Sequence, residues 1–344
     1  MASFLVTGGC GFIGSHLVDL LVAEGHDVRV LDNLASGKKE NLSAGTELIV
    51  GDITDRETVA ESMRDIDGCF HLASVASVVW ADGDWPGSHQ VNLAGSVNIF
   101  NAARERKVPV VYASSSAVYG DNADTPLREH AAVRPLTAYG ADKLGNELHA
   151  RVASLIHGVP TVGLRLFNVY GPRQDPKASS SGVIATFVDQ VLQGGPVTIH
   201  GDGDQVRDFV HVTDVARFLR RAMSKAVPQP TVFNVCSGRA TSVRHLAHLV
   251  MSIAGKQVPV AHVGARCGDI RAYVGDPARS RDVLGVRVET SLADGLRRLV
   301  VQRKAADRWL PSAWGAIPRS GTRVQSTAQP GFYRATIRRD GVSS

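Results

Sequence analysis

The sequence predicts an α/β fold with a doubly wound parallel sheet, a Rossmann fold, followed by a smaller C-terminal α/β cap. In the first half of the 344-residue chain, short continuous apolar segments alternate with segments whose apolar residues recur at helical spacing. Strands that are apolar on both faces are typical of parallel sheets covered by helices on each side. Right-handed crossovers between such strands give the doubly wound arrangement.

The elements of the first half follow from this alternation. A helix over Phe12–Glu24 is expected to end at Gly25, because glycine favours the backbone conformation that follows a helix. Thr54 and Glu57 predict a capping box at the start of a helix that runs to about Arg64. The other segments expected are strands at Ser3–Thr7, Asp27–Leu31, Glu47–Val50, Cys69–Ala73, Val110–Ala113 and Thr161–Leu166, and helices at His89–Arg106 and Thr137–His157.

The alternation changes after Asn168, where a serine-rich loop follows, and this change marks the expected cap. We assign residues 1–168 to a dinucleotide-binding Rossmann domain, with a later contribution from about 205–240. Residues 169–302 are mainly a substrate-binding cap, and residues 303–344 are a basic tail that we expect to be partly disordered. The expected elements are helices at Val183–Leu192, from Asp214 and at Ser242–Ala254, and strands at Val197–His200 and Thr231–Val235.

The net charge of +5 is concentrated in the tail. Residues 303–344 carry eight Lys or Arg side chains and two acidic ones, whereas the rest of the chain has a net charge of −1. We interpret the tail as a solvated basic segment and expect no nucleic-acid partner. Nucleic-acid binding by the tail's arginines and aromatic residues is the alternative from a different functional class.

Membrane, secretion and metal signals are weak. No apolar run approaches the roughly 18 residues of a membrane span, and the N-terminus lacks the cationic region of a signal peptide. The four cysteines, at 10, 69, 236 and 267, are far apart and form no metal-binding or disulfide pattern. We therefore expect a cytoplasmic protein with reduced thiols, no membrane partner and no metal.

A glycine-rich loop, Thr7-Gly8-Gly9-Cys10-Gly11-Phe12-Ile13-Gly14, lies between the first strand and the first helix. Gly8 permits the tight turn, Gly11 lets the backbone approach a pyrophosphate, and Gly14 lets the helix pack closely on the strand. The helix N-terminus then faces the phosphates. Asp32, at the end of the second strand, can accept hydrogen bonds from a ribose and repels a 2′-phosphate, so the cofactor indicated is NAD. A glycine turn without a ligand is the alternative that we disfavour.

Tyr139 and Lys143 lie four residues apart, and therefore on one face of a helix. Alone, this spacing is common and a surface pair is the simpler interpretation. Here it follows a serine triplet, 114–116, at the carboxyl end of a parallel strand, which is the edge where ligands bind. A neighbouring ammonium and a cationic nicotinamide both favour phenolate, so Tyr139 is a candidate base near neutral pH.

These motifs resemble those of the extended short-chain dehydrogenases/reductases, and among them the UDP-glucose 4-epimerase group of nucleotide-sugar epimerases. The resemblance covers about residues 3–300 and does not include the tail. The motifs that carry it are TGGCGFIG from Thr7, DNLASG from Asp32, GDI from Gly51, HLAS from His71, SSSAVYG from Ser114, YGADK from Tyr139, LRLFNVYGPRQ from Leu164, GDGDQVRDFVHVTDVA from Gly201 and RCGDIRAY from Arg266.

The resemblance implies a role for each matching position. The catalytic residues are Ser115, with Ser116 as the alternative, the base Tyr139 and its partner Lys143. The cofactor-binding residues implied are Gly8, Gly11, Phe12, Ile13, Gly14, Asp32, Asn33, Ser36, Asp52, Ile53, Leu72, Ala73, Ser74, Tyr139 and Lys143. The substrate-binding residues implied are Ser77, Ser115, Ser116, Tyr139, Asn168, Thr198, Ile199, His200, Arg207, Arg266, Asp269 and Tyr273. For Arg207 and Arg266, a salt bridge to the neighbouring Asp208 or Asp269 is the competing interpretation.

The function implied is an NAD-dependent nucleotide-sugar 4-epimerase, an isomerase that inverts a sugar C4 hydroxyl through a 4-keto intermediate. Related dehydratases and decarboxylases carry carboxylates where this chain has Ser116 and Ala117, so we disfavour them. The bulky Tyr273 favours UDP-glucose and UDP-galactose. Because Ser77 and the segment 79–87 depart from the family pattern, UDP-N-acetylhexosamine, UDP-glucuronate or another oxidoreductase of the family stays open. A non-catalytic NAD-binding scaffold is the distant alternative.

The family also implies a homodimer. The contact expected is a four-helix arrangement that uses the helices near Val91–Arg106 and Thr137–His157 of each copy.

Overall fold

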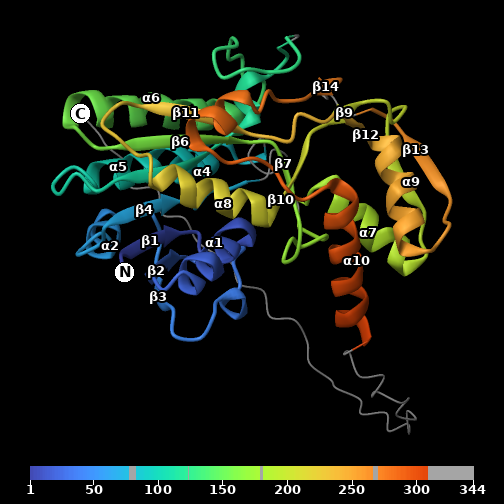
Figure 1. The fold of residues 1–344 in the computed structure, drawn as a ribbon, viewed down its shortest axis with the longest axis horizontal. Helices are drawn as coiled ribbons and strands as arrows, with labels where there is room; N and C mark the ends of the chain where they lie inside the picture. Colours follow the sequence, from blue (N-terminus) through green and yellow to red (C-terminus); the bar gives the residue numbers. More distant parts are fainter. Residues whose placement is uncertain (77–82, 123, 179–180, 266–269, 309–344) are drawn as a thin grey trace, which may run out of the picture.

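The computed structural model describes residues 1–76, 83–122, 124–178, 181–265 and 270–308, and these residues form a central parallel sheet with a cap at one side (Figure 1). The sheet has seven strands in the order β11-β6-β5-β4-β1-β2-β3, and every neighbouring pair is parallel. The predicted doubly wound Rossmann sheet is therefore confirmed. Its strands are β1 (Ser3–Thr7), β2 (Asp27–Asp32), β3 (Glu47–Val50), β4 (Gly68–His71), β5 (Val110–Ser115), β6 (Thr161–Leu166) and β11 (Thr231–Val235).

Helices cover both faces of the sheet because its strands are apolar on both faces. Phe4 and Val6 of β1 are buried in the core beneath α1 and α8, whereas Leu5, between them, is buried in the core beneath α2, α5 and α6. Helices α1 and α8 pack side by side on their face (Figure 1). The bounds are α1 (Phe12–Ala23), α2 (Arg56–Ser62), α4 (Trp85–His89), a π-helix η2 (Gln90–Gly95), α5 (Ser96–Ala102), α6 (Ala138–His157) and α8 (Val212–Met223), with short 3₁₀ helices η1 (Lys39–Asn41) and η3 (Ser116–Tyr119).

Strand β1 lies between β2 and β4, so the direction in which strands are added reverses at this point of the sheet. The loops that leave the carboxyl ends of β1 and β4 meet there. Gly8 has φ +69°, and a Cβ on it would lie 2.7 Å from the backbone nitrogen of Ala73. Glycine is thus required at position 8 both by conformation and by space. In open α/β sheets this reversal is where ligands bind.

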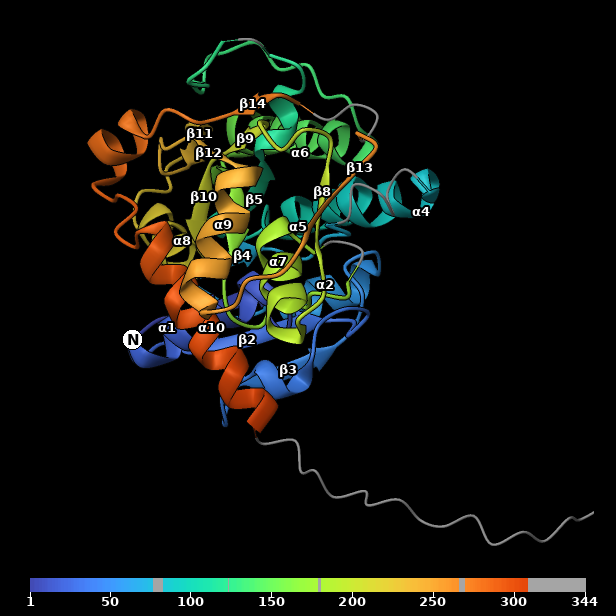
Figure 2. The same cartoon turned by 90° about the vertical axis from the view of Figure 1, so that its right-hand side faces the viewer.

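The cap is formed by α7 (Val183–Gln193), α9 (Val243–Ala254) and α10 (Leu292–Arg308), which surround a second apolar core (Figure 2). Short ladders accompany these helices. Their strands are β7 (Asn168–Tyr170) with β10 (Phe209–His211), β8 (Val197–His200) with β13 (Val260–Val263), and β9 (Val206–Arg207) with β12 (Thr241–Ser242) and β14 (Ala272–Tyr273); η4 (Ser280–Leu284) precedes α10.

Two element predictions need correction. The predicted capping box at Thr54 is wrong, because Asp55 is the N-cap of α2 and its carboxylate accepts from Glu57 N, while the Thr54 hydroxyl donates to Asp52 at 2.8 Å. The helix predicted over 89–106 begins and ends earlier, because α4, the π-helix and α5 follow one another from Trp85 to Ala102.

The tail boundary predicted at residue 303 falls inside α10. Arg303 donates to Asp189 of α7 at 2.8 Å and Lys304 donates to the Ala254 carbonyl at 2.9 Å, so both contact the cap. The rest of the tail, 309–344, lies outside the described residues. None of the described helices is long and apolar enough to cross a membrane.

Candidate active site

A cavity of about 960 Å³ lies at the carboxyl edge of the sheet, between the Rossmann domain and the cap. The glycine loop, the ends of β2, β4 and β5, and the first turn of α6 form one side of it. The cap contributes β9 and the segment before β14. All of the predicted cofactor-binding residues line the cavity: Gly8, Gly11, Phe12, Ile13, Gly14, Asp32, Asn33, Ser36, Asp52, Ile53, Leu72, Ala73, Ser74, Tyr139 and Lys143.

The N-terminus of α1 is directed at this cavity and is suited to a pyrophosphate. Among the described residues, no side chain caps this helix and no acidic residue lies in its first turn. A Cβ on Gly14 would lie 2.1 Å from the Gly8 carbonyl oxygen, whereas one on Gly11 would meet only that oxygen, at 3.2 Å. Gly14 is therefore needed for packing, while Gly11 leaves backbone accessible to a ligand. The free amides and the helix dipole favour an anion at this position.

Asp32 connects the glycine loop to β2. Its side chain accepts a hydrogen bond from Cys10 N at 2.9 Å and one from Leu34 N at 2.8 Å. The residue is only 7% exposed and still lines the cavity. A second carboxylate, that of Asp52, accepts from Asn33 Nδ2 at 2.7 Å. The two acids give this end of the cavity a negative character that suits ribose hydroxyls and disfavours a 2′-phosphate.

The three predicted catalytic residues meet at the other end of the cavity. Ser115 ends β5 and its hydroxyl accepts from Ala117 N at 3.1 Å, which caps η3. Tyr139 lies in the first turn of α6 and lines the cavity together with Ser115, whose side chain acts to lower the pKa of the Tyr139 phenol. Lys143 follows one turn later, with Nζ 5.5 Å from the centroid of the Tyr139 ring. The helix is fixed at this end by Thr137, whose hydroxyl accepts from Gly140 N.

Burial dominates the electrostatics of this group. It raises the pKa of Tyr139 to about 12, an effect that the Ser115 side chain partly offsets. Burial also lowers the pKa of Lys143 to about 8, against the attraction of the Asp142 carboxylate. The phenolate predicted at Tyr139 depends on two cations, the Lys143 ammonium and the nicotinamide of NAD⁺. In the protein without the second cation, desolvation keeps the pKa of the phenol high. A further positive charge in the cavity is needed to favour phenolate.

Two buried histidines near the site are structural, as their apolar surroundings predict. His71, at the end of β4, is hydrogen-bonded to Thr7 and to Ser96, each at 2.8 Å. Burial, together with the charge of Lys143, lowers the pKa of His71 to about 3. His211 is hydrogen-bonded to Thr213 at 2.8 Å, and burial lowers its pKa to about 4. Both rings are therefore neutral at physiological pH.

On the substrate side, the structure brings Ser115, Ser116, Tyr139, Asn168, Arg207 and Tyr273 to the cavity. The Tyr273 hydroxyl donates to the Ser116 carbonyl, which fixes the ring as part of the cavity wall. Arg207 donates from Nη1 to the carbonyls of Ile270 at 2.7 Å and Val206 at 2.9 Å. The neighbouring Asp208 is buried and accepts from Ser237, Gly238 and Gly275.

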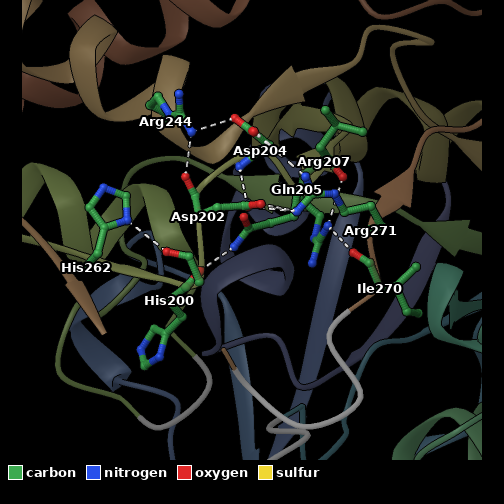
Figure 3. Close-up of polar contacts among 11 residues, drawn as sticks. His200, Asp202, Asp204, Gln205, Arg207, Arg244, His262, Ile270 and Arg271 are labelled. Atoms are coloured by element: carbon green, nitrogen blue, oxygen red, sulfur yellow. Dashed lines mark hydrogen bonds and ion pairs between the residues drawn. The ribbon is translucent and has the colours of Figure 1, made fainter. Parts of the chain in front are cut away.

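The structure places Thr198, Ile199 and His200 away from the cavity lining. Ile199 is buried in the cap core, and Thr198 N donates to Gln190. The His200 carbonyl accepts from Gln205 Nε2 at 2.8 Å, at the turn that leads to Arg207 (Figure 3). Ser77, Arg266 and Asp269 lie outside the described residues, so their roles stay predictions.

Ion pairs hold the turn before Arg207 in place (Figure 3). Both carboxylate oxygens of Asp202 accept from Arg271, at 2.7 and 2.8 Å. Asp204 pairs with Arg244 of α9 at 2.9 Å. The turn is thereby connected to α9 and to the segment that leads into β14.

Sequence analysis missed Asn92, which is fully buried in the π-helix. Its side-chain oxygen accepts from Ser74 Oγ and from Val75 N, both at 2.8 Å, and its amide donates to the Val75 carbonyl at 3.2 Å. It fixes the loop after β4 that lines the cavity. A polar residue within the apolar stretch Val91-Asn92-Leu93 was the signal available, and π-helical turns often occur at functional sites.

Sequence analysis also missed the segment after β7 that closes one side of the cavity. Arg173, Gln174 and Asp175 line it. Arg173 pairs with Asp19 of α1 at 2.8 Å, and Asp175 lies 3.5 Å from Lys38 of the loop after β2. The sequence Pro-Arg-Gln directly after a strand was the only local indication.

The model of the NAD-dependent epimerase/dehydratase family matches residues 4–236 of the chain. The protein therefore belongs to this family, and its cofactor is NAD, in agreement with the cavity. It is 37% identical over 306 residues to UDP-glucose 4-epimerase of Mycolicibacterium smegmatis, covering 86% of this chain and 96% of the relative.

Two solved structures share the fold over nearly their whole length. UDP-glucose 4-epimerase of Thermotoga maritima with UDP-glucose is 35% identical, with a TM-score of 0.85 over 88% of this chain and 99% of that one. UDP-N-acetylglucosamine 4-epimerase of Methanobrevibacter ruminantium, in complex with UDP-N-acetylmuramic acid, is 32% identical, with a TM-score of 0.84 over 89% and 99%.

Proposed function

We propose that the protein is an NAD-dependent 4-epimerase of UDP-sugars, with UDP-glucose and UDP-galactose as its substrate pair. The observation that carries the proposal is that Ser115, Tyr139 and Lys143 line one cavity, with Lys143 Nζ 5.5 Å from the centroid of the Tyr139 ring. The names of the relatives described above support a UDP-sugar 4-epimerase, since they act on UDP-glucose or UDP-N-acetylglucosamine.

Bound NAD⁺ supplies the acceptor, and after reduction the donor, of a hydride. Tyr139 Oη takes the proton of the sugar C4 hydroxyl as the 4-keto sugar forms, and returns it when the opposite face is reduced. Ser115 Oγ holds the same sugar oxygen by a hydrogen bond. Lys143 keeps a positive charge near Tyr139. This charge stabilises the phenolate, which burial otherwise disfavours.

Inversion requires the sugar to present both faces while the nucleotide stays bound. Arg207 and Asn168 line the same cavity as the glycine loop and suit a diphosphate anchor. With binding energy placed on the diphosphate and nucleotide, few contacts restrain the hexose, so it can rotate about this anchor.

Water elimination or decarboxylation needs an acid or base beyond Tyr139. The two positions where related enzymes carry it hold Ser116 and Ala117, and the Ser116 carbonyl accepts from Tyr273. The reaction favoured is therefore reversible oxidation at C4 without loss of a group.

Tyr273 also supports the plain hexose as substrate. Its ring is 7% exposed and packs near Phe167, with centroids 5.9 Å apart, so it forms a rigid wall. An N-acetyl group would need that wall to move. UDP-N-acetylhexosamine and UDP-glucuronate are the alternative substrates.

The test is incubation of the purified protein with UDP-glucose, UDP-N-acetylglucosamine and UDP-glucuronate, without added cofactor. We expect the galactose isomer from UDP-glucose, because NAD is regenerated in each turnover. If the protein converts only UDP-N-acetylglucosamine or only UDP-glucuronate, that sugar nucleotide replaces UDP-glucose as the assigned substrate. Absence of any isomer, with NAD bound, would refute the function.

We propose that the protein is a homodimer through the outer face of α6. Leu148, Val152, Leu155 and Ile156 follow each other at helical spacing and are 59, 48, 53 and 73% exposed. An apolar stripe of this kind on a surface helix favours burial against a second copy. A solution mass near 37 kDa would contradict this proposal, since one chain has a mass of 36.6 kDa.

The described cysteines Cys10, Cys69 and Cys236 are buried free thiols, which supports the cytoplasmic location that we propose.

A further inference from the structure

A buried polar network connects the end of β5 to the middle of α6, next to the cavity. At its centre, the Glu147 carboxylate accepts from Ser114 Oγ at 2.6 Å and from Arg165 Nε and Nη2 at 2.8 and 2.7 Å. The side chains of Glu147 and Arg165 are 8% and 6% exposed. Because neither charge can be left unpaired at this depth, each side chain fixes the position of the other.

The sheet register explains why these donors converge. Ser114 and Arg165 are directly opposite each other in the β5–β6 ladder, so their side chains lie on one face. Tyr112 of β5 lies on that face too, and packs in the same core as Ala150 of α6. The ladder therefore directs both donors toward α6, where Glu147 receives them.

The network continues around the short helix η3. The Arg165 guanidinium stacks on the Tyr119 ring, 4.8 Å from its centroid, and donates to the Glu129 carbonyl at 3.0 Å. The Tyr119 hydroxyl donates to Asn234 Oδ1 of β11 at 2.6 Å. Ser114 and Tyr119 are thus both held, one on each side of Ser115.

On α6, Tyr139, Lys143 and Glu147 follow at intervals of four residues and share one face. The end of β5 is therefore bonded to this face through Ser114 and Glu147, and the next residue, Ser115, lines the cavity together with Tyr139. We propose that Glu147, fixed by Arg165, is a positioning residue that holds Ser115 in its place beside Tyr139 at the cavity.

The inference rests on the proposed function where rates are concerned. Glu147 itself is absent from the cavity lining, so it acts through Ser114 and the strand end. A displacement of about 1 Å at reacting groups can cost about 100-fold in rate. The diphosphate anchor on β9 is part of a different segment, so substrate binding is expected to be unaffected.

Ser114→Ala removes the contact between strand and helix and leaves the ion pair intact. We expect kcat to fall roughly three- to tenfold with KM changed less than twofold, as expected when only transition-state positioning is lost. Glu147→Gln removes the charge, and we expect a loss of at least about tenfold. The acid limb of the kcat profile should move to higher pH in both variants, because a displaced Ser115 side chain lowers the pKa of Tyr139 less effectively.

Asp214→Asn is the matched control. Asp214 of α8 is 1% exposed and pairs with Arg217 at 2.9 Å, away from the cavity lining. This variant should lower stability and leave kcat per folded protein unchanged. If Ser114→Ala and Glu147→Gln behave in the same way, the network is structural only and the inference is wrong.

Crystal structures give a readout that does not depend on turnover. In Ser114→Ala the separation of Ser115 Oγ from Tyr139 Oη should be larger than in the wild-type protein. An unchanged separation would overturn the inference even if rates fall. If the wild-type protein converts no nucleotide sugar, the proposed function fails, whereas this separation still tests the role of Glu147.

Discussion

The Lys143 ammonium lies 5.5 Å from the centroid of the Tyr139 ring, and both residues face the cavity from consecutive turns of α6. Despite this cation, burial raises the pKa of Tyr139 to about 12. The base proposed here is thus a phenol that ordinarily keeps its proton, and its activation depends on positive charge gathered in the cavity.

Tyr139→Phe removes the base and leaves the ring. We expect kcat for UDP-glucose to fall by about 10²–10⁴, the usual contribution of general acid–base catalysis. Bound NAD and the unfolding midpoint should change little, because the ring still packs against Lys143. Turnover within tenfold of wild type would contradict the assignment of Tyr139.

Ser115→Ala and Ser116→Ala distinguish the two candidate serines. The Ser115 side chain acts to lower the pKa of Tyr139, whereas Ser116 uses its backbone carbonyl to accept from Tyr273, a contact that alanine retains. We expect about a 10- to 100-fold loss of kcat in Ser115→Ala and a change of less than threefold in Ser116→Ala. The reverse order would assign the role to Ser116.

Asp32→Ala tests the basis of cofactor choice. The carboxylate suits ribose hydroxyls and repels a 2′-phosphate. Its removal should therefore weaken NAD binding and lower the ratio of NAD affinity to NADP affinity by about tenfold or more. Titration of the apoprotein with each dinucleotide measures both. Asp32 also accepts hydrogen bonds from Cys10 N and Leu34 N, so its removal affects the loop as well as the cofactor. Asp52 makes neither of these contacts, and Asp52→Ala is therefore the comparison variant. Equal ratios of NAD affinity to NADP affinity in the wild type and in Asp32→Ala would contradict this role of Asp32.

His71 predicts an acid dependence of stability. Its pKa is about 3 in the folded protein, below the ordinary value of 6.5, so the unfolded chain binds a proton between these values and the folded one does not. Stability should therefore fall as the pH is lowered from about 6.5, by up to about 5 kcal/mol at pH 3 for this group. The free energy of unfolding, measured with urea at pH 7 and at pH 5, should differ less between the two pH values in His71→Asn than in the wild type. Parallel pH dependences of the two proteins would contradict this assignment.

Local sequence signals predicted the parts of the fold whose residues depend on near neighbours. The bounds of β1, β3, β6, β8 and β11 agree with the segments expected. The glycine loop and the helical spacing of Tyr139 and Lys143 placed the two ends of the cavity, because the residues of each motif are close in the chain.

The contacts that were missed join distant segments. Asn92 and Ser74 are separated by 18 residues, and Ser114 and Glu147 by 33, so no periodicity reveals either contact. The two-residue strands of the cap are too short to show a pattern. The effect of burial on the pKa of Tyr139 likewise depends on the complete fold and not on near neighbours in the chain.

The central claim is that hydrogen leaves and returns to C4 within the active site. The most direct test is conversion of UDP-glucose deuterated at C4, with purified protein in ordinary water and no added cofactor, followed by NMR. The account predicts UDP-galactose that keeps its deuterium at C4. Product that carries solvent hydrogen at C4 would contradict it.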